Sequence, residues 1–281
     1  MIFPAVLFIF VFLFWPIIQS IILSMQETQW FEAQNYVGLA NYSKIFKDSE
    51  FWIALKNTAI ITAASVPVIV VLATFFSILL NNKLHGITVF RVCFFIPAIT
   101  ILAASTLVWK WIMNGDYGIL NYFLSFFGVE PIHWISNPKT SLLLLIIIQV
   151  WSALGNNIII LLAGLQNIPT TYYEAAKLDG ANVTKLFRHI TLPMLSPTLF
   201  FIVVTIVIRT LQLFDAPYML ISNSKDIMYD RVGTIIYKYF YESFTQHNIG
   251  YGSSVVVTLF GLILIITAIQ FLCQKFWVNY D

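Results

Sequence analysis

Long apolar runs, separated by shorter polar segments, dominate the chain. A helix needs roughly 20 consecutive apolar residues to cross a hydrocarbon core of about 30 Å. The runs that meet this requirement are residues 2–24, 58–80, 92–113, 142–165, 198–221 and 254–273. The pattern therefore predicts an all-α, polytopic membrane protein with six transmembrane helices and both termini on one side. Pro16, Pro67 and Pro97 lie inside these runs and predict kinks.

The composition supports a membrane location and argues against a soluble or nucleic-acid-binding protein. Of the 281 residues, 59% are hydrophobic and only 10% are charged, which leaves too little polar surface to coat a soluble body. The mean hydropathy of +0.83 points the same way. The net charge is only +2 and the basic residues are scattered, so no nucleic-acid-binding face is indicated. The first run is expected to remain as an anchor, because no basic residue precedes it and no small-residue cleavage pattern follows it.

The distribution of Lys and Arg slightly favours cytoplasmic termini. In that orientation the inner segments 81–91, 166–197 and 274–281 hold six basic residues in 51 positions, whereas the outer segments hold seven in about 92. Cys93 and Cys273 then fall at cytoplasmic span ends, where a disulfide is not expected. The histidines lie in four different loops without partners at metal-ligand spacing, so neither a metal site nor a cofactor is expected.

The inner segment between the fourth and fifth runs has the pattern of two short helices. Thr171 and Glu174 have the spacing of a capping box, which predicts a helix start. Gly180 can adopt the left-handed conformation that ends a helix. Asn182 is then expected to cap a second helix that runs to about Ile190, and Pro193 to stop it. The sequence therefore predicts a helix, a glycine turn and another helix over residues 168–197.

This loop resembles the EAA loop of ABC importer permeases. The residues that carry the resemblance are Glu174, Ala175 and Ala176, then Gly180, and then the Ile190-x-Leu192-Pro193 segment. Residues 38–42, 50–52, 57–58, 94–97, 109–111, 164–166 and 212–215 resemble the carbohydrate-uptake branch that includes the maltose-transporter permeases. The resemblance implies a type I ABC importer fold in a bacterial plasma (inner) membrane. It also implies an importer domain at 58–273 with its coupling loop at 166–197, preceded by a first helix and outer loop at 1–57 and followed by a cytoplasmic tail at 274–281.

The same resemblance implies partners and a role for the loop. A second homologous permease subunit, two cytoplasmic ABC ATPase subunits and an extracellular solute-binding protein would complete the importer in the lipid bilayer. The loop would dock on an ATPase subunit. The residues assigned to this coupling contact are Tyr173, Glu174, Ala175, Ala176, Asp179, Gly180, Ile190, Leu192 and Pro193.

Two alternatives apply to this loop. It can be a surface connector whose alanines reflect helix propensity and whose Gly180 is only a helix end. A catalytic role for Glu174 is disfavoured, because no nucleophile, base partner or metal ligand lies near it in the sequence. The chain also lacks a Gly-x-x-x-x-Gly-Lys-Ser/Thr phosphate loop, so ATP hydrolysis is expected of partner subunits and not of this chain.

Polar residues inside the fourth and fifth runs suggest a path for the solute. Gln149, Ser152 and Asn156 share one helix face, and Thr205, Arg209 and Gln212 share another. An arginine halfway along a span costs at least roughly 3 kcal/mol in lipid, so it must face a wet cavity or a partner. The full set assigned to the substrate path is Gln149, Trp151, Ser152, Asn156, Asn157, Thr205, Arg209, Gln212 and Asp215, with Trp151 available to stack on a sugar ring.

Several interpretations of these polar residues stay open. The amides can instead bind helices together, as polar side chains in bundles often do. Arg209 also raises the hypothesis of an anionic solute such as a uronate, a sialic acid or glycerol phosphate. An ion-coupled secondary transporter would need titratable groups in the path, and the spans offer only Arg209 and Asp215. A membrane enzyme is disfavoured because the spans hold no paired carboxylates and no His cluster.

Overall fold

The computed structural model describes residues 2–29, 32–81, 86–221 and 233–279. Within them, five helical stretches are long and apolar enough to cross a membrane, and a sixth is possible if a bent pair of helices counts as one span. These stretches are Phe3–Ser24, Ser49–Asn81, Lys139–Gln166, Val183–Leu220 and Ile249–Phe276, with Val89–Ile99 and Leu102–Ile112 as the bent pair. Within the described residues, the all-α class and five of the six apolar spans predicted from the sequence are therefore confirmed.

The chain forms two compact units, each assembled from separate stretches of sequence. One unit comprises Met1–Ala59 and Gln212–Ile265, and the other comprises Ile60–Leu211 and Ile266–Asp281. Helices α4 (Ser49–Asn81) and α15 (Ile249–Cys273) contribute to both. The divisions expected from the sequence, at 57/58 and 273/274, stay predictions.

The first unit contains a small antiparallel hairpin, and polar contacts attach this hairpin to neighbouring helices. Asn41 donates from Nδ2 to the carbonyl oxygens of Ser24 and Gln26, at 2.9 Å each. The backbone N–H of Gly250 donates to Oγ1 of Thr28 at 2.6 Å. In chain order the elements are α1 (Phe3–Ile9), a π-helical turn (Phe10–Phe14), α2 (Trp15–Ser24), β1 (Gln26–Gln29), β2 (Glu32–Tyr36), α3 (Ala40–Lys47), the start of α4, α12 (Asp215–Ile221), α14 (Ile235–Phe240), a π-helical turn (Tyr241–Thr245) and most of α15.

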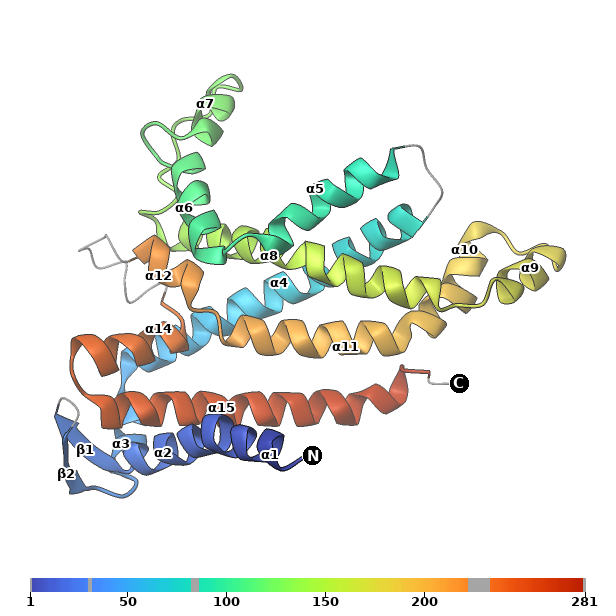
Figure 1. Ribbon diagram of the computed structural model, residues 1–281. Coiled ribbons are helices and arrows are strands. Elements are labelled where there is room, and N and C mark those ends of the chain that lie inside the picture. Colours follow the sequence, from blue (N-terminus) through green and yellow to red (C-terminus); the bar gives the residue numbers. More distant parts are fainter. Residues whose placement is uncertain (1, 30–31, 82–85, 222–232, 280–281) are drawn as a thin grey trace. The chain divides into compact units, whose positions relative to one another are not determined.

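The second unit is built around α8 (Pro138–Gln166), which packs against both α5 (Ile87–Ile99) and α11 (Leu192–Leu211) (Figure 1). A side chain at Gly155 would lie 2.6 Å from the carbonyl oxygen of Phe94, so glycine lets α5 approach α8 closely. The other elements are the rest of α4, α6 (Leu102–Ile112), α7 (Ile119–Ser125), α9 (Thr170–Leu178), α10 (Val183–Leu186), a π-helical turn (Phe187–Thr191), the end of α15 and a 3-10 turn (Gln274–Phe276).

The third predicted span, residues 92–113, is not one continuous helix. The helix axis changes direction by 104° between α5 and α6. Thr100 and Ile101 between them are extended, with ψ of 142° and 123°. Pro97 lies one turn before this break and has no N–H to continue the helix, and Thr100 donates its hydroxyl to the Pro97 carbonyl at 2.9 Å. The bend is therefore far sharper than the kink that Pro97 predicted, whereas α4 runs through Pro67 as one helix.

Candidate functional site

The predicted coupling loop is a helical hairpin, but its first helix starts differently from the prediction. Helix α9 begins at Thr170 after Pro169, and no side chain caps it. The Thr171–Glu174 capping box is therefore wrong. Pro169 has an extended ψ of 132° and already starts the helix, so Thr171 lies within the first turn, where its backbone is helical and not that of a cap.

The turn of the hairpin forms as predicted. Gly180 has a φ of +74°, in the left-handed region. The N–H of Gly180 donates to the Lys177 carbonyl at 3.0 Å, and the N–H of Ala181 donates to the Ala176 carbonyl at 2.9 Å, so the last carbonyls of α9 are satisfied. Asn182 accepts from the backbone N–H of Lys185 at 2.9 Å and caps α10.

The second helix does not stop at Pro193, which corrects the prediction. Helix α10 passes through the π-helical turn directly into α11, and Pro193 is the second residue of α11. The missing N–H of Pro193 would interrupt a regular α-helix, and here the π-helical turn that ends at Thr191 changes the hydrogen-bond spacing just before the proline. The hairpin is therefore continuous with the helix that carries Thr205 and Arg209.

The residues assigned to coupling gather on this hairpin and at its base. Glu174, Ala175, Asp179, Gly180 and Leu192 are exposed, and Tyr173, Ala176, Ile190 and Pro193 are partly exposed. The Tyr173 hydroxyl lies 3.0 Å from Oγ1 of Thr191, which ties α9 to the base of α11. Leu178 and Val183, which the sequence patterns did not single out, are 89% and 81% exposed. These two exposed aliphatic side chains near Gly180 form an apolar tip of the hairpin. In the sequence, apolar residues next to a predicted surface turn were the pattern that could have revealed this tip.

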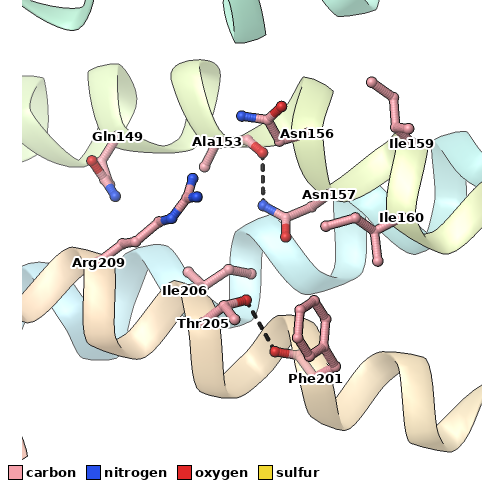
Figure 2. A pocket seen from close by; sticks show the side chains of 10 residues that line it. All are labelled: Gln149, Ala153, Asn156, Asn157, Ile159, Ile160, Phe201, Thr205, Ile206 and Arg209. Atoms are coloured by element: carbon pink, nitrogen blue, oxygen red, sulfur yellow. Dashed lines mark hydrogen bonds between the residues drawn. The ribbon is translucent and has the colours of Figure 1, made fainter. Parts of the chain in front are cut away.

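A second feature is a cavity of about 270 Å³ between α8 and α11 (Figure 2). The predicted path residues that line it are Gln149, Asn156 and Asn157 from α8 and Thr205 and Arg209 from α11. Ala153, Ile159, Ile160, Phe201 and Ile206 complete its lining. The two polar helix faces inferred from the sequence are thus brought together within one unit.

The other predicted path residues do not line this cavity. Trp151 packs edge to face against Trp109, with ring centroids 6.0 Å apart, and borders a separate, mainly apolar cavity of about 490 Å³ beside the α5–α6 bend. The hydroxyl of Ser152 donates to the carbonyl of Gln149 at 3.2 Å. Gln212 and Asp215 are exposed residues of the other unit.

Some polar side chains of the cavity form hydrogen bonds within the protein, and others have no such bond among the described residues. Gln149 donates from Nε2 to Oγ1 of Thr210 at 3.2 Å, and Asn157 donates from Nδ2 to the Ala153 carbonyl at 2.7 Å. Asn156 and Arg209 are exposed. Neither makes a side-chain hydrogen bond or ion pair with the rest of its unit, as far as the structure describes that unit. The amide and the guanidinium therefore remain available to a solute.

The first unit contains an ionic cluster that the sequence did not predict. Lys238, with a side chain only 7% exposed, lies 3.1 Å from Asp48, 2.7 Å from Glu50 and 3.3 Å from Glu242. The Tyr251 hydroxyl donates to Oδ2 of Asp48, the same carboxylate oxygen that Lys238 approaches. These residues come from the α3–α4 junction, α14 and its π-helical turn, and α15, so no local pattern joins them. The cluster fastens these elements to one another.

Burial and hydrogen bonding act in opposite directions in this cluster. Burial by itself would raise the pKa of Asp48, but hydrogen bonds from Tyr251 and Lys238 outweigh it and lower that pKa. Burial would likewise lower the pKa of Lys238, and the bonds to Glu50 and Asp48 instead raise it. For Glu242, burial dominates and raises the pKa. Within the described part of the chain, no three His, Cys, Asp or Glu side chains are grouped as metal ligands.

The apolar helices, the glycine hairpin and the polar cavity define a multi-pass membrane permease. Residues 51–276 match the family described as binding-protein-dependent transport system inner membrane component. The chain belongs to this family.

Similar proteins support the carbohydrate-uptake branch indicated by the loop motif. The probable ABC transporter permease protein YesP of Bacillus subtilis is 35% identical, over 95% of this chain and 86% of that protein. The arabinooligosaccharides transport system permease protein AraP of Halalkalibacterium halodurans is 32% identical, over 95% and 84%. The trehalose/maltose transport system permease protein MalF of Thermococcus litoralis is 30% identical, over 98% and 92%. The resemblance to carbohydrate-uptake ABC permeases is confirmed.

A solved structure shows the same fold. One chain of a bacterial alginate ABC transporter, in complex with an alginate pentasaccharide-bound periplasmic protein, superposes with a TM-score of 0.87 at 18% identity. The match covers 98% of this chain and 92% of that chain. The type I ABC importer fold implied by the loop motif is therefore confirmed.

Proposed function

We propose that the chain is a permease subunit of an ATP-driven importer that moves a sugar or oligosaccharide across a bacterial plasma membrane. Its relatives include permeases named for arabinooligosaccharides, trehalose/maltose and lactose. The observation that carries the proposal is the exposed helical hairpin joined without a break to a cavity-lining helix. A second permease subunit, two ATPase subunits and an extracellular binding protein complete the importer. The termini of the chain lie in the cytoplasm.

The hairpin is the element that docks on an ATPase subunit. Its tip presents Leu178 and Val183 beside the left-handed Gly180, so a partner cleft can bury apolar surface there. Glu174 and Asp179 lie exposed on the same hairpin and supply polar contacts around that apolar tip. The ATPases supply the energy, because this chain has no phosphate-binding loop of its own.

A movement of the hairpin is transmitted to the cavity because the hairpin and the cavity-lining helix α11 are directly connected. Helix α10 continues into α11, and Tyr173 ties α9 to Thr191 at the start of that helix. When the ATPases close, they favour the membrane conformation that fits the closed state, which is a shift of population. A shift of α11 relative to α8 changes the cavity, since Thr205 and Arg209 move with α11.

Replacement of Gly180 tests the docking role. Gly180→Val should place a β-branched side chain in a left-handed conformation, at a cost of about 1–3 kcal/mol to the native turn. Among the described residues, and apart from the two neighbours in the chain, no atom lies within 4 Å of the position that a Cβ would take, so the variant tests backbone conformation and not crowding. The assembled importer, reconstituted in proteoliposomes with its binding protein, should show strongly reduced ATP-dependent sugar uptake and reduced coupled ATP hydrolysis.

Gly180→Asn is the matched control, because asparagine tolerates the left-handed conformation and should retain uptake. Both variants should insert in the membrane at wild-type levels. Normal uptake and coupled hydrolysis in Gly180→Val would refute the docking role. Uptake that persists without ATP but follows an ion gradient would instead support a secondary transporter.

A further inference from the structure

Arg209 is a cation without a counterion in the part of its unit that the structure describes. It lies in the last turn of α11, within the apolar stretch Val183–Leu220, and lines the cavity from that helix. None of the residues that line this cavity is acidic, so the lining carries one net positive charge. Figure 2 shows the guanidinium directed from α11 toward α8, on the side of Gln149 and Asn156.

A neutral sugar does not require this charge. Hydroxyl groups accept hydrogen bonds from amides, and the cavity already holds Gln149, Asn156 and Asn157. A guanidinium near the centre of a span carries an insertion cost of roughly 3 kcal/mol, and recognition of a neutral sugar has no need of its charge. Five N–H donors in a planar fork fit a carboxylate or sulfonate with two parallel bonds.

The remaining lining fits a sugar that carries such a group. Asn156 offers an open amide for a ring hydroxyl, and Phe201, Ile159 and Ile160 offer apolar surface for the ring's C–H face. Gln149 joins the two cavity walls, α8 and α11, through its bond to Thr210, and Asn157 bonds within α8 to the carbonyl of Ala153.

We infer that Arg209 binds an anionic group on the transported solute, which is an acidic saccharide with a carboxylate or a sulfonate. This inference rests on the proposed function, and it narrows the solute within that function. Asn156 is its polar companion in the site.

Affinity for matched probes tests the inference without depending on the binding protein. The assembled importer in nanodiscs is titrated with a galacturonate disaccharide, its neutral methyl ester, and a sulfonated disaccharide with its unsulfonated counterpart. The wild type should bind at least one acid form at least ten-fold more tightly than its neutral partner. Arg209→Gln should lose this preference while it binds the neutral forms within about three-fold of wild type. Arg209→Lys should keep part of the preference, because the charge remains and the fork is lost.

Lys139→Gln is the control, because it removes an exposed cation at the start of α8, outside the cavity, and should leave the preference unchanged. If no acidic probe binds better than its neutral partner, or if Arg209→Gln keeps the preference, the inference is overturned. It is also overturned if Arg209→Gln releases the second permease, because Arg209 would then pair with an acid of that subunit. ATP-dependent uptake of neutral sugars by the same preparation tests the proposed function separately.

Discussion

Lys238 and Arg209 show two ways of keeping a cation in a highly apolar chain. Lys238 is buried in one unit and has three carboxylates within 3.3 Å of its ammonium group. Arg209 faces a cavity in the other unit and has no carboxylate partner among the described residues of that unit. Burial of an unpaired charge is expensive, so Lys238 needs its partners, whereas Arg209 is exposed at the cavity and does not bear the full cost of burial.

The difference separates a structural cation from one that can bind a solute. Two of the three partners of Lys238, Asp48 and Glu50, come from a distant part of the sequence, so the ammonium joins α14 to the start of α4. Tyr251 of α15 bonds to Asp48 and so joins the same cluster. Arg209 contributes no such bond, and its donors are free for another molecule. The number of carboxylate partners is thus more informative about role than position within a span or a loop.

The largest expected effect is on stability, when the positive charge of Lys238 or of Arg209 is removed. Lys238→Met should destabilise the protein by about 3–5 kcal/mol, because it leaves partly buried carboxylates together without their cation. Arg209→Met should change stability by no more than about 0.5 kcal/mol, because no intramolecular bond is lost. Thermal unfolding of the assembled importer in detergent measures both, with Lys47→Met as the exposed control. Equal destabilisation by the two substitutions would remove the distinction.

A smaller effect should separate the two amides of the cavity. Gln149→Leu breaks the 3.2 Å bond to Thr210 and should cost about 1 kcal/mol of stability. Asn156→Leu breaks no bond that the structure describes and should leave stability nearly unchanged. Sugar uptake should instead fall about three- to ten-fold in Asn156→Leu, the value of one neutral hydrogen bond. The opposite pattern would make Asn156 the helix-binding amide and Gln149 the solute contact.

The sequence predicted what depends on local or periodic patterns. Apolar runs of sufficient length predicted the spans, and the glycine at position 180 and the cap at Asn182 predicted the hairpin turn. The shared faces of Gln149 and Asn156, and of Thr205 and Arg209, predicted a common polar lining. Each of these depends on residues within a few positions of one another, where helix geometry fixes the outcome.

Other features depend on tertiary context and were missed or wrong. The sequence cannot show that α5 and α6 meet at 104°, because a proline in a span is compatible with either a kink or a break. The helix continues through Pro193 because a π-helical turn precedes it, and that turn has no clear sequence signal. The Lys238 cluster joins residues up to 203 positions apart, as in the bond between Tyr251 and Asp48, so no local spacing reveals it.

The smallest expected effect is the dependence of stability on pH, and it arises only in the Lys238 cluster. Glu242 has a pKa raised above its ordinary 4.5 by burial, so the folded protein binds this proton more readily than the unfolded chain. Stability should therefore rise slightly as the pH falls from neutral through that raised pKa. Asp48 has a pKa lowered below 3.8, so its contribution is complete above pH 3.8 and is lost as the pH falls through the lower, folded value.

Thermal unfolding between pH 7 and pH 3 should therefore show a shallow rise followed by a decline. Glu242→Gln should abolish the rise and keep the decline, because the amide does not titrate while Asp48 keeps its bonds to Tyr251 and Lys238. Asp48→Asn should reduce the decline. Arg209→Gln should leave the whole profile unchanged, since Arg209 has no carboxylate partner in the described part of its unit. A profile that changed with Arg209 would mean that an acid outside the described residues pairs with it, and the contrast between the two cations would then disappear.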